Sequence, residues 1–89
     1  MKAIVTVIGK DHVGITAAVC SLLAEHDINI MDITQTLLQD FFTMVMLVDL
    51  SACPHSIGEM ADLLDRAGRE RGLSIRIQRE DIFNAMHRI

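Results

Sequence analysis

Two stretches of this 89-residue chain are apolar on both faces of an extended backbone, and they constrain the fold more than any other feature. Residues 2–8 and residues 41–50 carry apolar side chains at both odd and even positions. Because successive side chains of a strand point to opposite faces, such segments are typical of strands that are covered on two sides. The sequence therefore predicts a sheet in which these two strands need cover on both faces.

The remaining elements follow from apolar spacing and from capping signals. Ile15, Val19 and Leu22 recur at helical spacing, which predicts a helix that ends near His26. Ser56 lies three residues before Glu59, the pattern of a capping box, and we expect this second helix to end at Gly72. Residues 28–38 are expected to form a strand that polar residues interrupt, so that part of it faces solvent or bulges, and residues 73–78 alternate strictly as in a half-buried strand.

The expected order is strand, helix, strand, strand, helix, strand, followed by a short amphipathic helix over residues 81–89. Residues 28–38 and 41–50 are separated by a short turn, which indicates an antiparallel hairpin. Right-handed crossovers place both main helices on one face of a four-stranded sheet. This is the ferredoxin-like βαββαβ arrangement of the α+β class, in a single domain over residues 1–89.

Charge and hydropathy exclude several classes of protein. Eight Lys and Arg against twelve Asp and Glu leave a net charge of −4, which disfavours a nucleic-acid binder because such proteins present a basic face. No run of about 18 uncharged apolar residues occurs, so no membrane span is expected. The apolar start ends at Gly9 without a small-residue cleavage site, and two cysteines are too few for a disulfide scaffold. A cytoplasmic protein is expected.

Motifs for cofactor or catalytic chemistry are missing from the sequence. There is no C-x-x-C pair and no glycine-rich phosphate loop, and the four histidines lack metal-ligand spacing. A small phosphatase of this fold class would need an arginine in its phosphate cradle, yet no arginine precedes Arg66. We therefore expect neither an enzyme nor a metal or cofactor site.

The loop over residues 9–15 is the most informative segment for function. A strand ends there and a helix begins, so free N–H groups of the first helical turn favour an anionic group such as a carboxylate. Gly14 permits a positive φ, and Asp11 either caps the helix or accepts a hydrogen bond from a ligand ammonium. Asn29 would supply a donor and an acceptor if its strand lay beside the first one. Taken alone, these residues favour an ordinary turn at a helix start over a ligand site.

Several segments resemble a known family. The runs 8–15 (IGKDHVGI) and 27–30 (DINI) resemble the ACT domain, and the similarity extends in order through essentially the whole chain. The segments 32–36 (DITQT) and 40–44 (DFFTM) and the tail 79–89 (REDIFNAMHRI) are similar to the free-standing ACT subgroup UPF0237. The tail is the more specific of these signals.

The resemblance implies a regulatory domain that senses a small molecule, most often an amino acid, and regulates a partner protein. Its ligand would bind at the interface of a homodimer or higher homo-oligomer, between the first loop and the start of the second strand. Carried over by position, the ligand-binding residues would be Asp11, His12, Val13, Gly14, Ile15, Asn29 and Ile30. Many ACT loops have Arg-Pro where this chain has His12-Val13, which leaves the identity of the ligand open.

A second hypothesis is a ligand-independent dimerisation or docking module that acts through the last helix, residues 81–89. Both hypotheses involve self-association. The composition supports it independently, because 51% of the residues are apolar and two helices cover only one face of the sheet. We expect the other face or a sheet edge to be covered by the last helix, by a second subunit, or by both.

Overall fold

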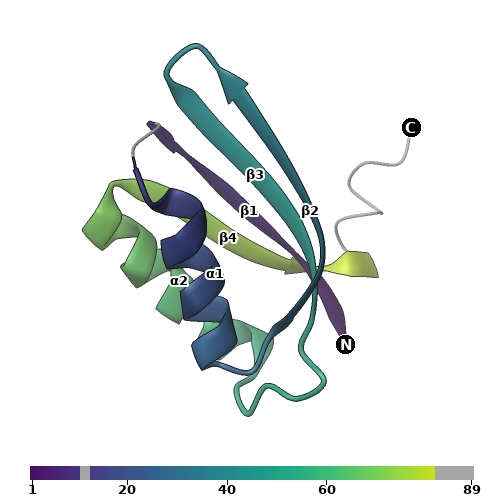
Figure 1. Ribbon diagram of the computed structural model, residues 1–89. Coiled ribbons are helices and arrows are strands. Elements are labelled where there is room, and N and C mark those ends of the chain that lie inside the picture. Colours follow the sequence, from purple (N-terminus) through teal and green to yellow (C-terminus); the bar gives the residue numbers. More distant parts are fainter. Residues whose placement is uncertain (11–12, 82–89) are drawn as a thin grey trace.

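The structure, a computed structural model, describes residues 1–10 and 13–81 (Figure 1). The described part contains β1 (Lys2–Lys10), α1 (Ile15–Glu25), β2 (Asn29–Leu38), β3 (Phe41–Asp49), α2 (Ile57–Arg71) and β4 (Leu73–Arg79). This order and the four-stranded sheet confirm the ferredoxin-like prediction. The helix expected over residues 81–89 lies, apart from Asp81, outside the described residues.

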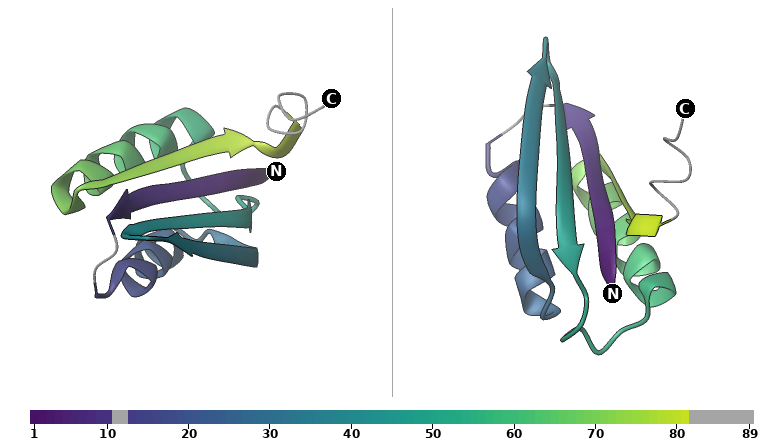
Figure 2. Two further views of the ribbon diagram at one scale, coloured as in Figure 1. Left: turned by 90° about the horizontal axis from the view of Figure 1, so that it is seen from above. Right: turned by 90° about the vertical axis from the view of Figure 1, so that its right-hand side faces the viewer.

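The strand order in the sheet is β2-β3-β1-β4, and every neighbouring pair is antiparallel. The two strands that are apolar on both faces, β1 and β3, are therefore the inner ones. Both helices lie on the same face of the sheet, as the two views of Figure 2 show. Neither of them is long and apolar enough to cross a membrane.

The core lies between this face of the sheet and the helices. Ala3, Val5 and Val7 of β1 are fully buried, and their register partners on β3 are Val48, Met46 and Met44. Full burial of an aliphatic side chain contributes roughly 1.5–3 kcal/mol. The helices supply the other wall of the core, whose fully or almost fully buried members are Ile15, Val19, Leu23, Met60 and Leu64.

The first strand is longer than its sequence pattern indicates. Gly9 and Lys10 were expected in the loop, but they pair with Phe42 and Phe41 and extend β1 to Lys10. A Cβ atom on Gly9 would lie 2.5 Å from Leu73 Cδ2 and 3.3 Å from the Gly72 carbonyl oxygen, so a larger residue would fit here only if the Leu73 side chain moved. Gly9 and Lys10 were placed in the loop because glycine and polar residues favour turns. In the structure, pairing with β3 and packing against β4 keep both residues in the strand.

The predicted caps of α2 are confirmed. Ser56 Oγ accepts a hydrogen bond from the Glu59 N–H at 3.1 Å, and Glu59 Oε1 accepts one from the Ser56 N–H at 2.9 Å. The hydrogen bond from the Ser56 backbone, followed by that from the Ser56 side chain, lowers the pKa of Glu59. Gly72 ends the helix with φ of 70°.

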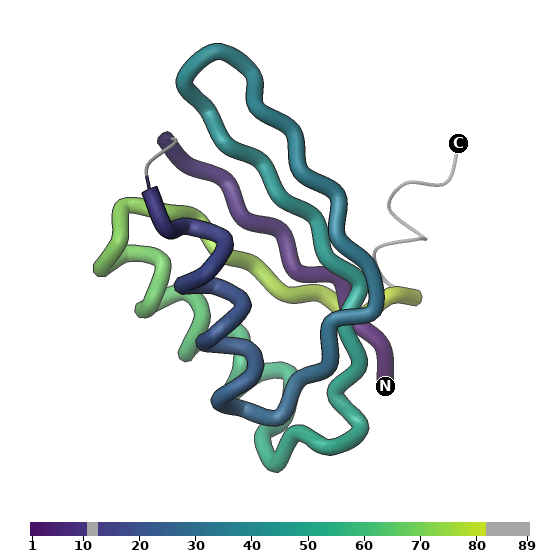
Figure 3. Tube along the Cα trace, in the orientation of Figure 1, coloured from purple at the N-terminus to yellow at the C-terminus, as the bar shows by residue number. Residues whose placement is uncertain are grey.

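The second strand carries both irregularities expected of it. A β-bulge interrupts its pairing between Ile30 and Asp32, and residues 31–40 are all exposed. The trace in Figure 3 shows that the β2–β3 hairpin extends beyond the start of α1. The β2 part of this hairpin arm is thus exposed on both faces, whereas Phe42 of β3 is buried on the side of the helices.

The sheet face away from the helices, here named the open sheet face, carries the alternate side chains of all four strands. The register places six apolar residues on it: Ile4, Ile8, Leu38, Phe41, Val45 and Leu47. Ile8, Phe41 and Leu38 are 46%, 53% and 72% exposed. No other part of the described chain covers them.

Candidate functional site

No side chain of the described residues caps the start of the first helix. Its N-cap is Gly14, whose φ of 87° and ψ of 6° lie in the left-handed region that glycine favours. The first helical bond runs from the Ala18 N–H to the Gly14 carbonyl oxygen at 2.9 Å, so the N–H groups of residues 15–17 have no helical acceptor. Among the described residues no side chain occupies this end of α1, whereas in α2 the Ser56 side chain accepts from the Glu59 N–H.

The structure divides the predicted ligand-binding residues between two ends of the molecule. Val13 and Gly14 are exposed beside the start of α1, while Ile15 is buried and anchors that turn in the core. Asp11 and His12 lie outside the described residues. Asn29 and Ile30 lie at the far end of α1, where β2 begins (Figure 1).

Strand pairing makes this separation unambiguous. Asn29 pairs with Asp49, which in turn pairs with Lys2 at the start of β1. The loop, in contrast, follows Lys10, which pairs with Phe41 at the other end of the same strands. The condition under which Asn29 would lie near the loop, that its strand is a neighbour of β1, is not met, because β3 separates the two strands. Within one protomer no small ligand can touch both Gly14 and Asn29.

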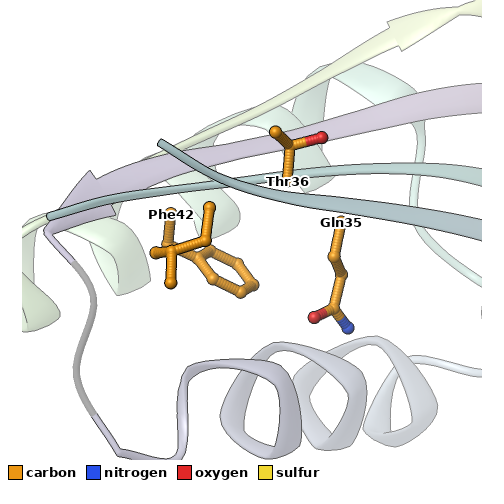
Figure 4. Close-up of a pocket in the computed structure, with 4 residues that line it drawn as sticks. Gln35, Thr36 and Phe42 are labelled. Atoms are coloured by element: carbon orange, nitrogen blue, oxygen red, sulfur yellow. The ribbon is translucent and has the colours of Figure 1, made fainter. Parts of the chain in front are cut away.

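A pocket lies at the loop end of the molecule, under the β2–β3 hairpin. Gln35, Thr36, Leu37 and Phe42 line it, and its volume is about 320 Å³. Figure 4 shows the side chains of Gln35 and Phe42 pointing toward α1, with Thr36 directed to the other side of the strand. Because Phe42 pairs with Gly9, the pocket and the start of α1 share one end of the sheet.

Gln35 is a polar residue of this site that was not predicted from the sequence. It pairs with the buried Met44, which places it on the helix-facing side of β2. On that side it stands between Ile33 and Leu37, so the signal was one amide in an otherwise apolar alternation. Such an amide offers both a donor and an acceptor, the role expected of Asn29.

The chain is similar to known proteins in sequence as well as in fold. A family model described as "ACT domain" matches residues 2–78. The chain belongs to the ACT domain family. A UPF0237 protein of Clostridium acetobutylicum is 56% identical over 89 residues, with 100% of each chain covered. One from Methanopyrus kandleri is 52% identical over 88 residues, covering 99% of this chain and 98% of the relative. Both the family and the UPF0237 subgroup are therefore confirmed.

Solved structures share the fold of this ACT domain. An ACT domain protein from Streptococcus pneumoniae is 40% identical, with 98% of each chain covered and a TM-score of 0.84. A protein described as a glycine cleavage system transcriptional repressor is 26% identical with a TM-score of 0.75, and the match covers 86% of this chain and 44% of that one. ACT domains are typically ligand-sensing regulatory modules, and the second structure is described as a regulator.

Outside this site, two histidines of the ACT domain, His26 and His55, lie close together. His26 Nδ1 lies 2.9 Å from the Leu22 carbonyl oxygen, and its ring centroid is 5.5 Å from that of His55. Cys20 and Cys53 are half-buried free thiols. No group of three or more metal-ligating side chains occurs within residues 1–10 and 13–81. The polar groups near the pocket are suited to binding a small molecule through hydrogen bonds.

Proposed function

We propose that this ACT domain is a regulatory module that binds a free amino acid and transmits the bound state to a partner protein. The observation that supports it most directly is the first turn of α1, which no described side chain caps, at the end of the sheet where the hairpin pocket holds Gln35. Two features that an amino acid requires, an anion-binding helix start and a neutral amide, are thereby found at one end of the fold.

In this proposal the two charged groups of the amino acid fix its orientation in the site. Its carboxylate accepts hydrogen bonds from the N–H groups of residues 15–17, where the helix dipole adds roughly half a positive charge. Its ammonium donates to Oε1 of Gln35. Its side chain lies against Phe42 and Leu37, so that the character of this apolar surface selects among amino acids. Asp11 and His12 remain predicted members of the same loop.

A second protomer completes this site in our proposal. Leu37 is 58% exposed, so the pocket has an open wall. Asn29 and Ile30 of the same protomer are too distant, and they contribute only if the partner subunit presents them to the loop. A ligand held between two protomers has different affinities for different arrangements of the subunits, and this difference is what a regulatory switch requires.

Calorimetric titration of the wild-type protein with each of the free amino acids tests the proposal. We expect a restricted subset to bind. Gln35→Ala should weaken that binding about ten- to a hundredfold, because a hydrogen bond to a charged group contributes about 1.5–3 kcal/mol. Thr34→Ala is the matched control, since the register of β2 places Thr34 on the face opposite Gln35 and Thr34 does not line the pocket.

The absence of binding up to millimolar concentrations would overturn the proposal. In a protein that is folded and self-associated, that result would favour the ligand-independent docking module instead. Equal affinity of wild type and Gln35→Ala would show that the ligand binds outside the hairpin pocket.

A further inference from the structure

The end of α1 and the loop before α2 lie at the same end of the molecule, away from the tip of the β2–β3 hairpin (Figure 1). Each of these segments carries a histidine: His26 is the C-cap of α1, and His55 directly precedes Ser56, the N-cap of α2. The two ring centroids are 5.5 Å apart, and the ring planes are tilted by 54°. Both residues are half-buried, so the fold holds the rings while solvent still reaches them.

In each of these rings one nitrogen faces an oxygen atom and the other has no partner. His26 Nδ1 lies 2.9 Å from the Leu22 carbonyl oxygen, and His55 Nδ1 lies 3.8 Å from Glu59 Oε2. Within the described residues, Nε2 of neither histidine has a hydrogen-bond partner. A histidine that binds a metal typically directs its other ring nitrogen to a carbonyl or carboxylate oxygen. The two rings therefore have the outer contacts that are typical of metal ligands.

We propose that Nε2 of His26 and Nε2 of His55 together bind one divalent transition-metal ion of the kind that imidazole prefers, such as Zn²⁺. The separation of the rings fits this arrangement. With metal–nitrogen bonds of about 2.1 Å at a tetrahedral angle, two imidazole centroids lie about 5 Å apart, close to the observed 5.5 Å. Because the two histidines are distant in the sequence, their spacing along the chain does not indicate this site.

Water would fill the remaining coordination positions of the ion. Among residues 1–10 and 13–81, no third histidine, cysteine or acidic side chain joins the two rings as a possible ligand. His26 also lines an open groove between α1 and α2, with a volume of about 330 Å³, which gives the ion and its water molecules a path from solvent. The net charge of −4 favours the approach of a cation.

The ion would connect the end of α1 to the loop that precedes α2. This site shares no residue with the hairpin pocket and lies at the other end of α1 from Gly14, so the proposal goes beyond amino acid binding. Because an ion that binds only the folded chain stabilises it, Zn²⁺ should raise the midpoint of thermal unfolding in a concentration-dependent manner.

Calorimetric titration of the wild-type protein with Zn²⁺, without any amino acid present, measures this binding directly. We expect one ion per chain. His26→Gln and His55→Gln should each weaken binding at least about tenfold, because each removes one of the two protein ligands. Cys53→Ser is the matched control: it removes a different metal-binding side chain from the loop that carries His55, and it should keep the wild-type affinity.

Imidazole ¹⁵N NMR of the wild-type protein identifies the ligand atoms without any substitution, and Zn²⁺ should shift the Nε2 resonances of both histidines. Four results would overturn the proposal: no binding up to millimolar Zn²⁺, unchanged affinity in either histidine variant, loss of affinity in Cys53→Ser, or unshifted Nε2 resonances. Each would leave the ring pair as an aromatic contact only. None of them bears on amino acid binding, which the Gln35→Ala titration decides separately.

Discussion

Gly68 shows how a single buried position links α2 to β4. A Cβ atom there would lie 2.7 Å from the Leu73 carbonyl oxygen and 3.1 Å from Ile75 Cγ1. The first of these neighbours is backbone and cannot rotate away. The close approach of helix and strand therefore depends on the missing side chain, and not on the conformational freedom of glycine.

Gly68→Ala should destabilise the protein by about 1–3 kcal/mol, because overpacking exceeds the gain of up to about 1 kcal/mol in helix propensity. Urea denaturation followed by circular dichroism measures the change. Gly58→Ala in the same helix is the control: its new Cβ would meet only Ser56 Oγ at 3.9 Å, so stability should be kept or increase. If both variants are stabilised, the close contact with β4 does not exist in solution.

At the scale of the elements, the two helices differ in how their ends are satisfied. The start of α2 is closed by its own capping box, and its end by Gly72 with φ of 70°. The start of α1 has Gly14 with φ of 87° and no side-chain cap. At both glycines, the position that an alanine Cβ would occupy has no neighbouring atom within 4 Å, so any cost of alanine there comes from the backbone alone.

Gly14→Ala and Gly72→Ala should therefore reduce the free energy of unfolding by similar amounts, about 1–2 kcal/mol each. Only Gly14→Ala should weaken amino acid binding, since it alters the backbone that presents the N–H groups of α1. Thermal unfolding and calorimetric titration of the pair measure the two effects separately. Equal loss of binding in both variants would mean that the effect is general destabilisation.

The capping box of α2 also makes stability depend on pH. Hydrogen bonds from the Ser56 backbone and side chain lower the pKa of Glu59, so the folded state binds a proton at Glu59 less readily than the unfolded state does. This stabilisation is present above the ordinary pKa of glutamate, about 4.3, and is lost as pH falls through the lower folded value. Glu59→Gln keeps a neutral acceptor, and its stability should decline less between about pH 5 and pH 3. If the free energy of unfolding of wild type and of Glu59→Gln falls equally over this pH range, Glu59 does not have this role.

For the whole molecule, the main asymmetry lies between the inner and outer strands. β1 has hydrogen-bonded neighbours on both sides, whereas β2 pairs only with β3 and is exposed from residue 31 onward. The hairpin arm carries the pocket on one face and part of the open sheet face on the other. A ligand in the hairpin pocket would thus act on the least supported part of the sheet.

Native-state hydrogen exchange should reveal this gradient. We expect β1 amides to exchange only through global unfolding and β2 amides near the hairpin tip to exchange much faster. Addition of the cognate amino acid should slow exchange at the tip and in the first turn of α1 together. Uniform protection of β1 and β2 in the free protein would show that the arm is already covered in solution.

The two described helices, the caps of α2 and the number and order of the strands along the chain were predictable from the sequence. They depend on local physics: apolar periodicity, the Ser56–Glu59 capping box, and glycine at the end of α2. The two segments with apolar residues on both faces, 2–8 and 41–50, are the inner strands of the sheet. Strand ends were less predictable, because Gly9 and Lys10 are held in β1 by residues more than thirty positions away.

What the sequence determined by itself is the set of elements and the surplus of apolar surface that two helices cannot cover. The pairing of β2 with β3 was also predicted, but only the tertiary structure decided that β3 separates β2 from β1. Gln35, not Asn29, therefore shares an end of the molecule with the start of α1. The physical reason is that periodicity reports the environment of a side chain within its own element. The order of strands in the sheet depends on burial and pairing summed over the whole chain, so no local pattern contains it.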